Sequence, residues 1–366
     1  MCGEFQMTLN VVGMIGVTPS NGKIPVSIIG GGIDVDYLSK FTQAHEESNF
    51  DAVLVGYSSD SADSFAVAQA AAAATQKIKF LVAHRPGFVA PTLAARRAST
   101  VDIFTGGRIG VHFITGGSDA EQQRDGDHLG HDDRYRRTDE YLTVFRKALT
   151  AETFDHSGNY YQVKNASSAV QSTQTPSIPI YFGGSSEIAL EIGARQADVY
   201  MFWGEPRAAI QSQIEDLNIR AAKYGRTLRY SVSFRPVIED TEALAWEKAR
   251  EFLNTVESNV RTSPLRKRTS VGSQRLLDFA SKSDLHDERL WMPLAAATGA
   301  SGNTSALVGT PAQVADSLIQ YHKLGVETVL IRGWDPYQDA IDYGKELIPI
   351  LKHESAKVAE LVSAKA

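Results

Sequence analysis

The chain has almost no cysteine and no long hydrophobic run. Cys2 is the only cysteine among 366 residues, which excludes an intramolecular disulfide and a metal site built from several thiolates. No apolar run approaches the roughly 18 residues that a membrane-spanning helix needs. The opening MCGEFQMTLN also lacks a basic segment followed by an apolar one. We therefore expect a protein of the reducing cytoplasm that has no membrane partner.

An excess of positive charge is missing as well. Lys and Arg number 37 against 43 Asp and Glu, which gives a formal net charge of -6. This balance provides no broad electrostatic attraction to nucleic acid. No spacing of His, Asp and Glu is typical of a metal site, and the chain has no G-x-S-x-G nucleophile elbow. We expect neither a nucleic-acid partner nor a bound metal.

What the sequence does contain is a regular alternation of β-rich apolar runs with helical patterns. The predicted strands are Leu9–Ile15, Ala52–Val55, Lys79–Ala83, Ile109–Ile114, Ile178–Phe182, Val199–Phe202, Leu228–Phe234 and Thr328–Ile331. Prolines at Pro91, Pro206 and Pro311 are typical of helix starts. About eight such repeats, with strands that read as continuous apolar runs, predict a closed parallel (β/α)₈ TIM barrel. Since such barrels often form one long domain, we expect a single domain over residues 1–366.

Two irregular stretches interrupt the alternation. A polar, serine-rich insertion extends from about Asn259 to Ser305, and TGGSDAEQQRDGDHLGHDDRY follows the fourth strand from Thr115 to Tyr135. Long loops in a compact domain are usually functional lids or disordered. In a barrel both stretches would lie at the C-terminal ends of the strands, where barrel enzymes carry their chemistry. We expect the insertion to act as a lid.

Two glycine turns follow predicted strands. TGGS covers Thr115–Ser118, and FGGSS covers Phe182–Ser186. Glycines allow the backbone to approach a ligand closely, and the free N–H groups at a helix start attract an anion. Two such turns on one face favour a single phosphorylated cofactor. A structural role stays open, since Ser185 or Ser186 could simply cap the following helix.

Three longer segments resemble the bacterial luciferase-like flavin monooxygenases, and within them the two-component alkanesulfonate monooxygenases most of all. The segments are FLVAHRPGFVAPTLAARRASTVDIFTGGRIGVHFITGGSD, GHDDRYRRTDEY and IPIYFGGSSEIALEIGARQADVYMFWGEP. The resemblance extends from about Val35 to Ile350. It implies a (β/α)₈ barrel that receives reduced FMN (FMNH2) from a separate NAD(P)H-dependent flavin reductase. With O2, such enzymes oxygenate a small organic substrate, and sulfonates yield an aldehyde and sulfite.

The resemblance also assigns cofactor-binding residues. They are Ala83, His84, Thr115, Tyr135, Gly183, Gly184, Ser185 and Ser186. The glycines and serines would hold the FMN phosphate together with the Tyr135 hydroxyl, and Thr115 would lie at the polar edge of the flavin. The Ala83–His84 peptide falls where such barrels often have a non-proline cis bond beneath the ring, a strained feature that is usually tied to function.

The substrate side departs from the family pattern. Where the family has an arginine and a histidine near the end of the seventh strand, this chain has Ser233 and Arg235, and Trp334 replaces a tyrosine. Arg235 and Arg332 could restore the positive charge for an anionic substrate, or they could form structural ion pairs. Trp203 could be an apolar wall beside the flavin or simply part of the core. We predict that Trp203, Arg235, Arg332 and Trp334 are the catalytic residues.

Taken together, these features predict an FMNH2-dependent monooxygenase that acts on an organosulfonate or a related organosulfur compound. We expect a homodimer or homotetramer. Three alternatives remain: a monooxygenase for a neutral sulfone or ketone, a deazaflavin-dependent dehydrogenase, and a flavin-binding protein without catalytic activity.

Overall fold

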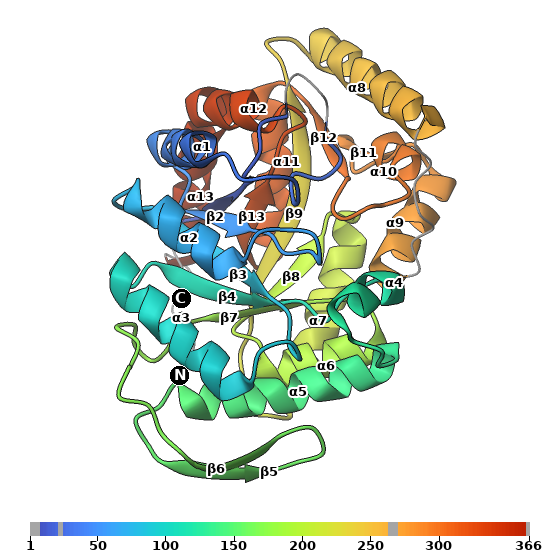
Figure 1. The fold of residues 1–366 in the computed structure, drawn as a ribbon. Helices are drawn as coiled ribbons and strands as arrows, with labels where there is room; N and C mark the ends of the chain where they lie inside the picture. The colour runs from blue at the N-terminus through green and yellow to red at the C-terminus, as the bar shows by residue number, and fades with distance from the viewer. Residues whose placement is uncertain (1–7, 21–24, 263–269, 364–366) are drawn as a thin grey trace.

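Parallel strands close into a barrel in the computed structural model of the chain, which describes residues 8–20, 25–262 and 270–363 (Figure 1). The barrel strands are β1 (Asn10–Ile15), β2 (Ala52–Val55), β3 (Lys79–His84), β4 (Ile109–Phe113), β7 (Ile180–Gly183), β8 (Val199–Trp203), β9 (Arg229–Ile238) and β13 (Val326–Ile331). Their order is β9-β13-β1-β2-β3-β4-β7-β8, and β8 pairs back with β9. The predicted barrel and its strands are confirmed, whereas Cys2 lies outside the described residues.

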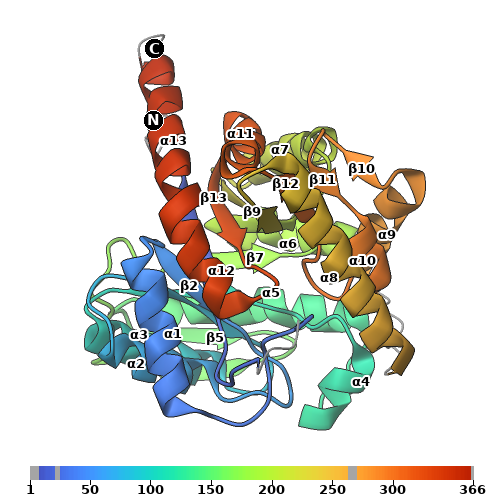
Figure 2. The ribbon, with the colours of Figure 1, turned by 90° about the horizontal axis from the view of Figure 1, so that it is seen from above.

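Helices surround the barrel (Figures 1 and 2). They are α1 (Val35–Glu47), α2 (Ser64–Ala73), α3 (Pro91–Thr105), α4 (Asp119–Gln122), α5 (His131–Ala148), α6 (Glu187–Gln196), α7 (Arg207–Ala222), α8 (Glu242–Thr262), α9 (Val271–Lys282), α10 (Pro293–Ala297), α11 (Pro311–Lys323), α12 (Pro336–Asp342) and α13 (Ile348–Ser363). A 3-10 turn (Gln123–Asp125) follows α4, and a π-helical turn (Tyr343–Leu347) joins α12 to α13. None of the helices in the described ranges combines the length and apolarity needed to cross a membrane.

Local signals explain where several helices begin. The Asp34 carboxylate accepts from the Tyr37 backbone N–H at 2.9 Å and so caps α1. Thr310 and Gln313 form a reciprocal capping box at the start of α11, next to a proline in the first turn. The sequence pattern did not predict α1, although its cap is visible in the sequence as an aspartate ahead of the helix.

The two faces of each barrel strand have different surroundings. On β4, Val111 and Phe113 are buried while His112 between them is partly exposed. The ring of Phe113 packs 5.0 Å from that of Phe145 on α5, so this face of the strand points toward the helices. Since successive strand residues point to opposite faces, His112 points into the barrel. The same alternation on β8 leaves Met201 and Trp203 partly exposed, so the barrel interior is open toward the ends of these strands.

Strand β9 extends beyond the barrel into a side sheet. Its first part, to Phe234, pairs with β13, and from Arg235 onward it pairs with β12 (Ala306–Gly309). Beyond β12 lie the short antiparallel strands β11 (Leu290–Trp291) and β10 (Leu285–His286). Helix α8 covers this side sheet (Figure 1) and shares with it a second small hydrophobic core that includes Val237 and Trp334.

The predicted insertion over 259–305 therefore has regular structure of its own. It contains α9, β10, β11 and α10 in the described residues, while 263–269 lie outside them. The sequence pattern predicted a long polar insertion there but none of these helices and strands. Strands of two residues are too short for an alternation to be visible, and the apolar face of α9 is limited because Leu276 is its one fully buried leucine.

A β-hairpin projects beyond α5 (Figure 1) and consists of β5 (Phe154–Ser157) and β6 (Gln162–Ala166). The carboxylate of Glu140 on α5 organises its turn, because it accepts from the backbone N–H groups of Asn159 at 2.9 Å and Tyr161 at 2.8 Å. Burial raises the pKa of Glu140, but these hydrogen bonds and one from His156 outweigh it, and the pKa is lowered overall.

Replacing Glu140 should therefore destabilise the protein in a pH-dependent way. We expect Glu140→Gln to lower the free energy of unfolding by about 1–3 kcal/mol at neutral pH, since bonds to a charged acceptor are lost. Because folding lowers the pKa of Glu140, the ionised carboxylate stabilises the folded state at pH values above the ordinary glutamate pKa of 4.5. This stabilisation is lost as the pH falls through the folded-state pKa. Urea unfolding at several pH values measures the effect. The exposed Glu152→Gln is the control, and an equal effect of both substitutions would contradict this account.

Candidate active site

The two predicted glycine turns lie at the ends of the neighbouring strands β4 and β7, with Tyr135 of α5 between them. A Cβ atom built on Gly184 would lie 3.0 Å from the Tyr135 hydroxyl oxygen. The hydroxyls of Thr115 and Ser186 lie close enough to that of Tyr135 to lower its pKa, although burial has the larger effect and raises it overall. The structure thus brings together Thr115, Tyr135, Gly184 and Ser186.

Gly184 is required by the close packing of the turn after β7. Its φ is +155°, and a Cβ there would come within 2.6 Å of the Ala189 side chain. The Gly184 carbonyl accepts a hydrogen bond from the Tyr200 hydroxyl at 2.8 Å. The backbone at Gly184 therefore lies where a side chain has no room, and the hydrogen bond from Tyr200 helps to fix its position.

The side chain of Ser186 does not cap the helix that follows. Ser186 occupies the N-cap position of α6 but makes no capping hydrogen bond through its side chain. Its hydroxyl oxygen is buried and has no partner in hydrogen-bonding geometry among the described residues. The start of a ten-residue helix thus combines free N–H groups with an unused hydroxyl, which is a donor set that fits a phosphate.

The predicted cis peptide at Ala83–His84 is wrong. Strand β3 continues through both residues in a regular parallel ladder, with Ala83 opposite His112 and His84 opposite Phe113. Such a ladder needs extended trans backbone, and the cis bond that occurs in the described ranges is Thr175–Pro176.

The side chain of His84 points away from the barrel interior. Its Nε2 lies 2.7 Å from the Tyr141 hydroxyl on α5, and its ring packs against Phe65 and Phe113. Burial lowers its pKa to about 4. His84 therefore belongs to the layer between barrel and helices, and the structure does not bring its imidazole to the open end of the strands.

Arg235 and Arg332 converge on the segment that follows β1, and Trp334 lies beside Arg235. Both guanidinium groups donate to the Val26 carbonyl, that of Arg332 through Nη2 at 2.7 Å. Arg235 also donates to the Asn303 carbonyl at 3.0 Å, and its guanidinium lies 4.3 Å from the centre of the Trp334 ring. The two arginines are only 2% and 7% exposed.

Neither arginine forms an ion pair with a carboxylate in the described ranges, so their known partners are neutral. Burial lowers the pKa of Arg332 to about 10, which still leaves it charged at neutral pH. The described contacts thus include no structural ion pair of Arg235 or Arg332, which was one of the two interpretations. Two buried positive charges share one backbone oxygen, and a stronger anionic acceptor could compete for them.

The start of α9 covers the glycine turns. A Cβ built on Gly272 would lie 3.0 Å from a ring carbon of Trp203 and 3.4 Å from the Ser185 hydroxyl oxygen. Ser270 approaches the other turn, since its Cβ lies 3.6 Å from the corresponding point on Gly117. The insertion therefore lies directly over Trp203 and both turns.

An ion pair fastens α9 to the barrel. Arg275 donates to both carboxylate oxygens of Glu205, with Nε at 2.7 Å from Oε1. Glu205 follows β8 and is 3% exposed, and Gln213 also donates to it at 3.0 Å. A buried carboxylate that lost this partner would be left with an uncompensated charge.

His112 is a site residue that sequence reasoning missed. It faces the barrel interior beside Ala83 on β3 and Tyr181 on β7. Burial lowers its pKa to about 4, and Nδ1 has no hydrogen-bond partner among the described residues. A single histidine within an apolar strand is indistinguishable by sequence from a structural one. The useful signal was its position: it is the next-to-last residue of β4 and alternates with the apolar residues Val111 and Phe113.

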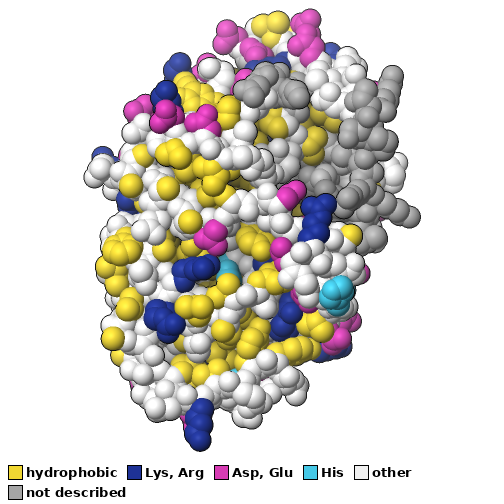
Figure 3. Space-filling model, viewed as in Figure 1, with side chains coloured by type: hydrophobic (Ala, Val, Ile, Leu, Met, Phe, Trp, Pro, Cys, Tyr) yellow, Lys and Arg dark blue, Asp and Glu magenta, His cyan; other side chains and the backbone are white. Residues whose placement is uncertain are grey.

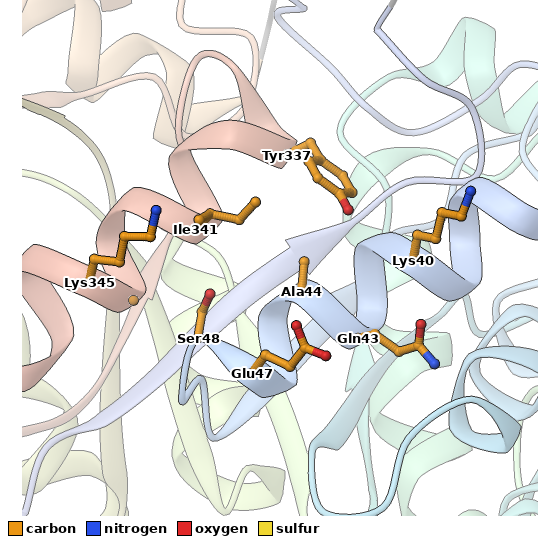
Figure 4. A pocket seen from close by; sticks show the side chains of 9 residues that line it. Lys40, Gln43, Ala44, Glu47, Ser48, Tyr337, Ile341 and Lys345 are labelled. Carbon is orange, nitrogen blue, oxygen red and sulfur yellow. The ribbon is translucent and has the colours of Figure 1, made fainter.

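A separate pocket of ≈ 380 Å³ lies outside the barrel between α1 and the α12 region (Figure 4). Its lining residues are Lys40, Gln43, Ala44, Glu47, Ser48, Tyr337, Ile341, Gly344 and Lys345. They come from helices rather than from strand ends, and none of the predicted site residues is among them. On the face seen in Figure 3, the described Lys and Arg side chains are scattered among hydrophobic, acidic and other residues.

Comparison with known proteins gives one family match. The model of the family described as luciferase-like monooxygenase matches residues 9–328.

Solved structures share the fold at low sequence identity. A riboflavin lyase with modified FMN and riboflavin has a TM-score of 0.77 at 19% identity, over 95% of this chain and 92% of that one. EDTA monooxygenase from Chelativorans sp. BNC1 has a TM-score of 0.74 at 19% identity, over 95% of both chains. An F420-dependent secondary alcohol dehydrogenase with an F420-acetone adduct has a TM-score of 0.67 at 16% identity, over 94% and 99%. At these identities the likeness extends to the fold alone.

Breaking the Glu205–Arg275 pair should loosen α9. We expect Arg275→Gln to speed chymotrypsin cleavage within α9 by about tenfold or more, because local opening becomes easier by the loss of a partly buried ion pair. Lys282→Gln, which removes an exposed ion pair with Asp278 on the same helix, is the control and should change little. Equal cleavage of Arg275→Gln and the parent would show that the pair does not hold the helix.

Proposed function

We propose that this chain, which belongs to the luciferase-like monooxygenase family, uses reduced FMN and O2 to oxygenate a small organic substrate. The observation that carries this proposal is the turn between β7 and α6, where the unpartnered Ser186 hydroxyl lies beside Tyr135 at a helix N-terminus. The reduced flavin would come from a separate NAD(P)H-dependent reductase, as the sequence resemblance implies.

The residues of the turn fit an FMN phosphate. Backbone N–H groups at the start of α6 and the hydroxyls of Ser185, Ser186 and Tyr135 would hold it, while Gly184 keeps the backbone close. Thr115 would lie toward the polar edge of the flavin. When bound, reduced FMN supplies the two electrons that O2 activation requires. The protein orients the flavin and excludes water from it.

Exclusion of water would depend on the insertion. The start of α9 lies over Trp203 and both glycine turns, and the Glu205–Arg275 pair holds it there. Closing α9 over the flavin would keep water away from the place where the flavin reacts with O2. In this proposal Trp203 forms the apolar wall between the flavin and the lid.

The substrate we propose is an organosulfonate or a related organosulfur compound, cleaved to an aldehyde and sulfite. Arg235 and Arg332 would bind its anionic group, with Trp334 beneath Arg235. Their present acceptor is a neutral carbonyl, and charge-assisted bonds to a sulfonate are stronger. Ser233 cannot replace the arginine of the family pattern, since its hydroxyl donates back to the Phe202 carbonyl at 3.2 Å.

A second candidate is a deazaflavin-dependent dehydrogenase. An F420-dependent secondary alcohol dehydrogenase shares the fold with a TM-score of 0.67, and a deazaflavin phosphate could use the same turn. Oxygen consumption with enzymatically reduced FMN would favour the monooxygenase. Hydride transfer from reduced F420 without oxygen consumption would favour the dehydrogenase.

A negative charge in the glycine turn should weaken FMN binding. We expect Ser185→Asp to raise the Kd for FMN about tenfold or more, because the carboxylate repels the phosphate at short range. Ser185→Ala is the control and should lose about tenfold at most, the equivalent of one hydrogen bond. Fluorescence titration measures both. Equal affinity of Ser185→Asp and the parent would remove this turn from the phosphate site.

Loss of an arginine should impair catalysis more than flavin binding. We expect Arg235→Ala or Arg332→Ala to lower kcat/KM for the best sulfonate about a hundredfold, since a buried charge pair is worth about 3 kcal/mol or more. FMN affinity, measured alongside, should stay within about threefold of the parent. If both variants act at the parental rate on the best substrate found, the two arginines do not recognise an anionic group, and a neutral sulfone or ketone becomes the better substrate candidate.

A further inference from the structure

We propose that His112 contacts the isoalloxazine ring of the bound flavin and supplies it with a hydrogen bond from the floor of the site. The inference rests on the proposed function, because it assumes that the flavin lies over the open ends of the strands. It adds a cofactor-positioning residue that neither glycine turn contains.

The position of His112 on β4 places its side chain inside the barrel. Its neighbours Val111 and Phe113 are buried on the helix side, so the imidazole points inward. In the ladder it lies between Ala83 of β3 and Tyr181 of β7. Thr115, which we place at the polar edge of the flavin, follows three residues later. His112 thus lies on the strand that leads to one glycine turn and beside the strand that leads to the other.

The hydrogen bonding of His112 differs from that of the fully buried histidines. Ring nitrogens of His45, His84 and His322 bond to the Phe41 carbonyl, the Tyr141 hydroxyl and the Val326 carbonyl at 2.7–2.8 Å. No hydrogen bond from either ring nitrogen of His112 is found within the described ranges, and its Nδ1 is buried. A buried polar atom without a partner is costly, so the unused bonding capacity of His112 indicates a ligand.

The chemistry of a neutral imidazole suits the flavin. Burial lowers the pKa of His112 to about 4, so at neutral pH it offers one N–H donor and one acceptor nitrogen. The pyrimidine part of the isoalloxazine has carbonyl acceptors and an N–H donor, and either can pair with such a ring. A neutral contact orients the flavin without adding a positive charge beneath it.

The test replaces His112 and measures flavin binding and redox potential rather than turnover. We expect His112→Leu to weaken binding of oxidised FMN about tenfold, as for one lost hydrogen bond. His112→Asn keeps a donor and an acceptor and should stay within about threefold of the parent. The midpoint potential of bound FMN should shift in His112→Leu in proportion to the logarithm of the ratio of its affinity losses for oxidised and reduced FMN, and it should shift less in His112→Asn.

The matched control is His84→Gln, on the neighbouring strand but on its outer face. It should leave the FMN midpoint potential unchanged, and thermal melting confirms that each variant is folded. If His112→Leu does not fold, His112→Phe keeps an aromatic ring without its nitrogens and takes its place. Parental affinity and potential in the Leu or Phe variant would overturn the role of His112. Failure of the parent itself to bind FMN would instead overturn the proposed function.

Discussion

Strand β9 belongs to two sheets, and the site depends on this double pairing. Up to Phe234 it closes the barrel by bonding to β8 and β13, and from Arg235 onward it bonds to β12 of the side sheet. The ladder continues through the change of partner, so β9 is a continuous element of both the barrel and the side sheet. Arg235 lies at the branch point, so its guanidinium is directed at the segment after β1 by the geometry of both sheets.

Most of the barrel could be predicted from the sequence, because its strands are apolar runs separated by capped or proline-started helices. The proximity of the two glycine turns could be predicted for a related reason: each follows a strand, and the C-terminal ends of parallel strands meet on one face of a barrel. The insertion could not, since β10 and β11 have two residues each and take their structure from pairing with each other and, for β11, with β12. Neither could the partner of the arginines, because Val26 is 209 residues from Arg235 and 306 from Arg332 in the chain.

The incorrect cis peptide has a physical reason as well. Whether a peptide at this point is cis or trans depends on whether the ladder of β3 stops before it or continues through it. Here β4 is long enough for His112 and Phe113 to pair with Ala83 and His84. The ladder therefore holds the bond extended. The same pairing turns His84 outward to Tyr141 and leaves the inner face to His112, a distribution that residue types alone do not reveal.

The segment after β1 is held through a main-chain oxygen, since both arginines donate to the Val26 carbonyl and neither contacts a carboxylate in the described residues. Every amino acid provides the same carbonyl, so this anchor is indifferent to which side chain stands at position 26. Substitutions at position 26 can therefore change the side chain that the segment presents while both arginines still donate to its backbone.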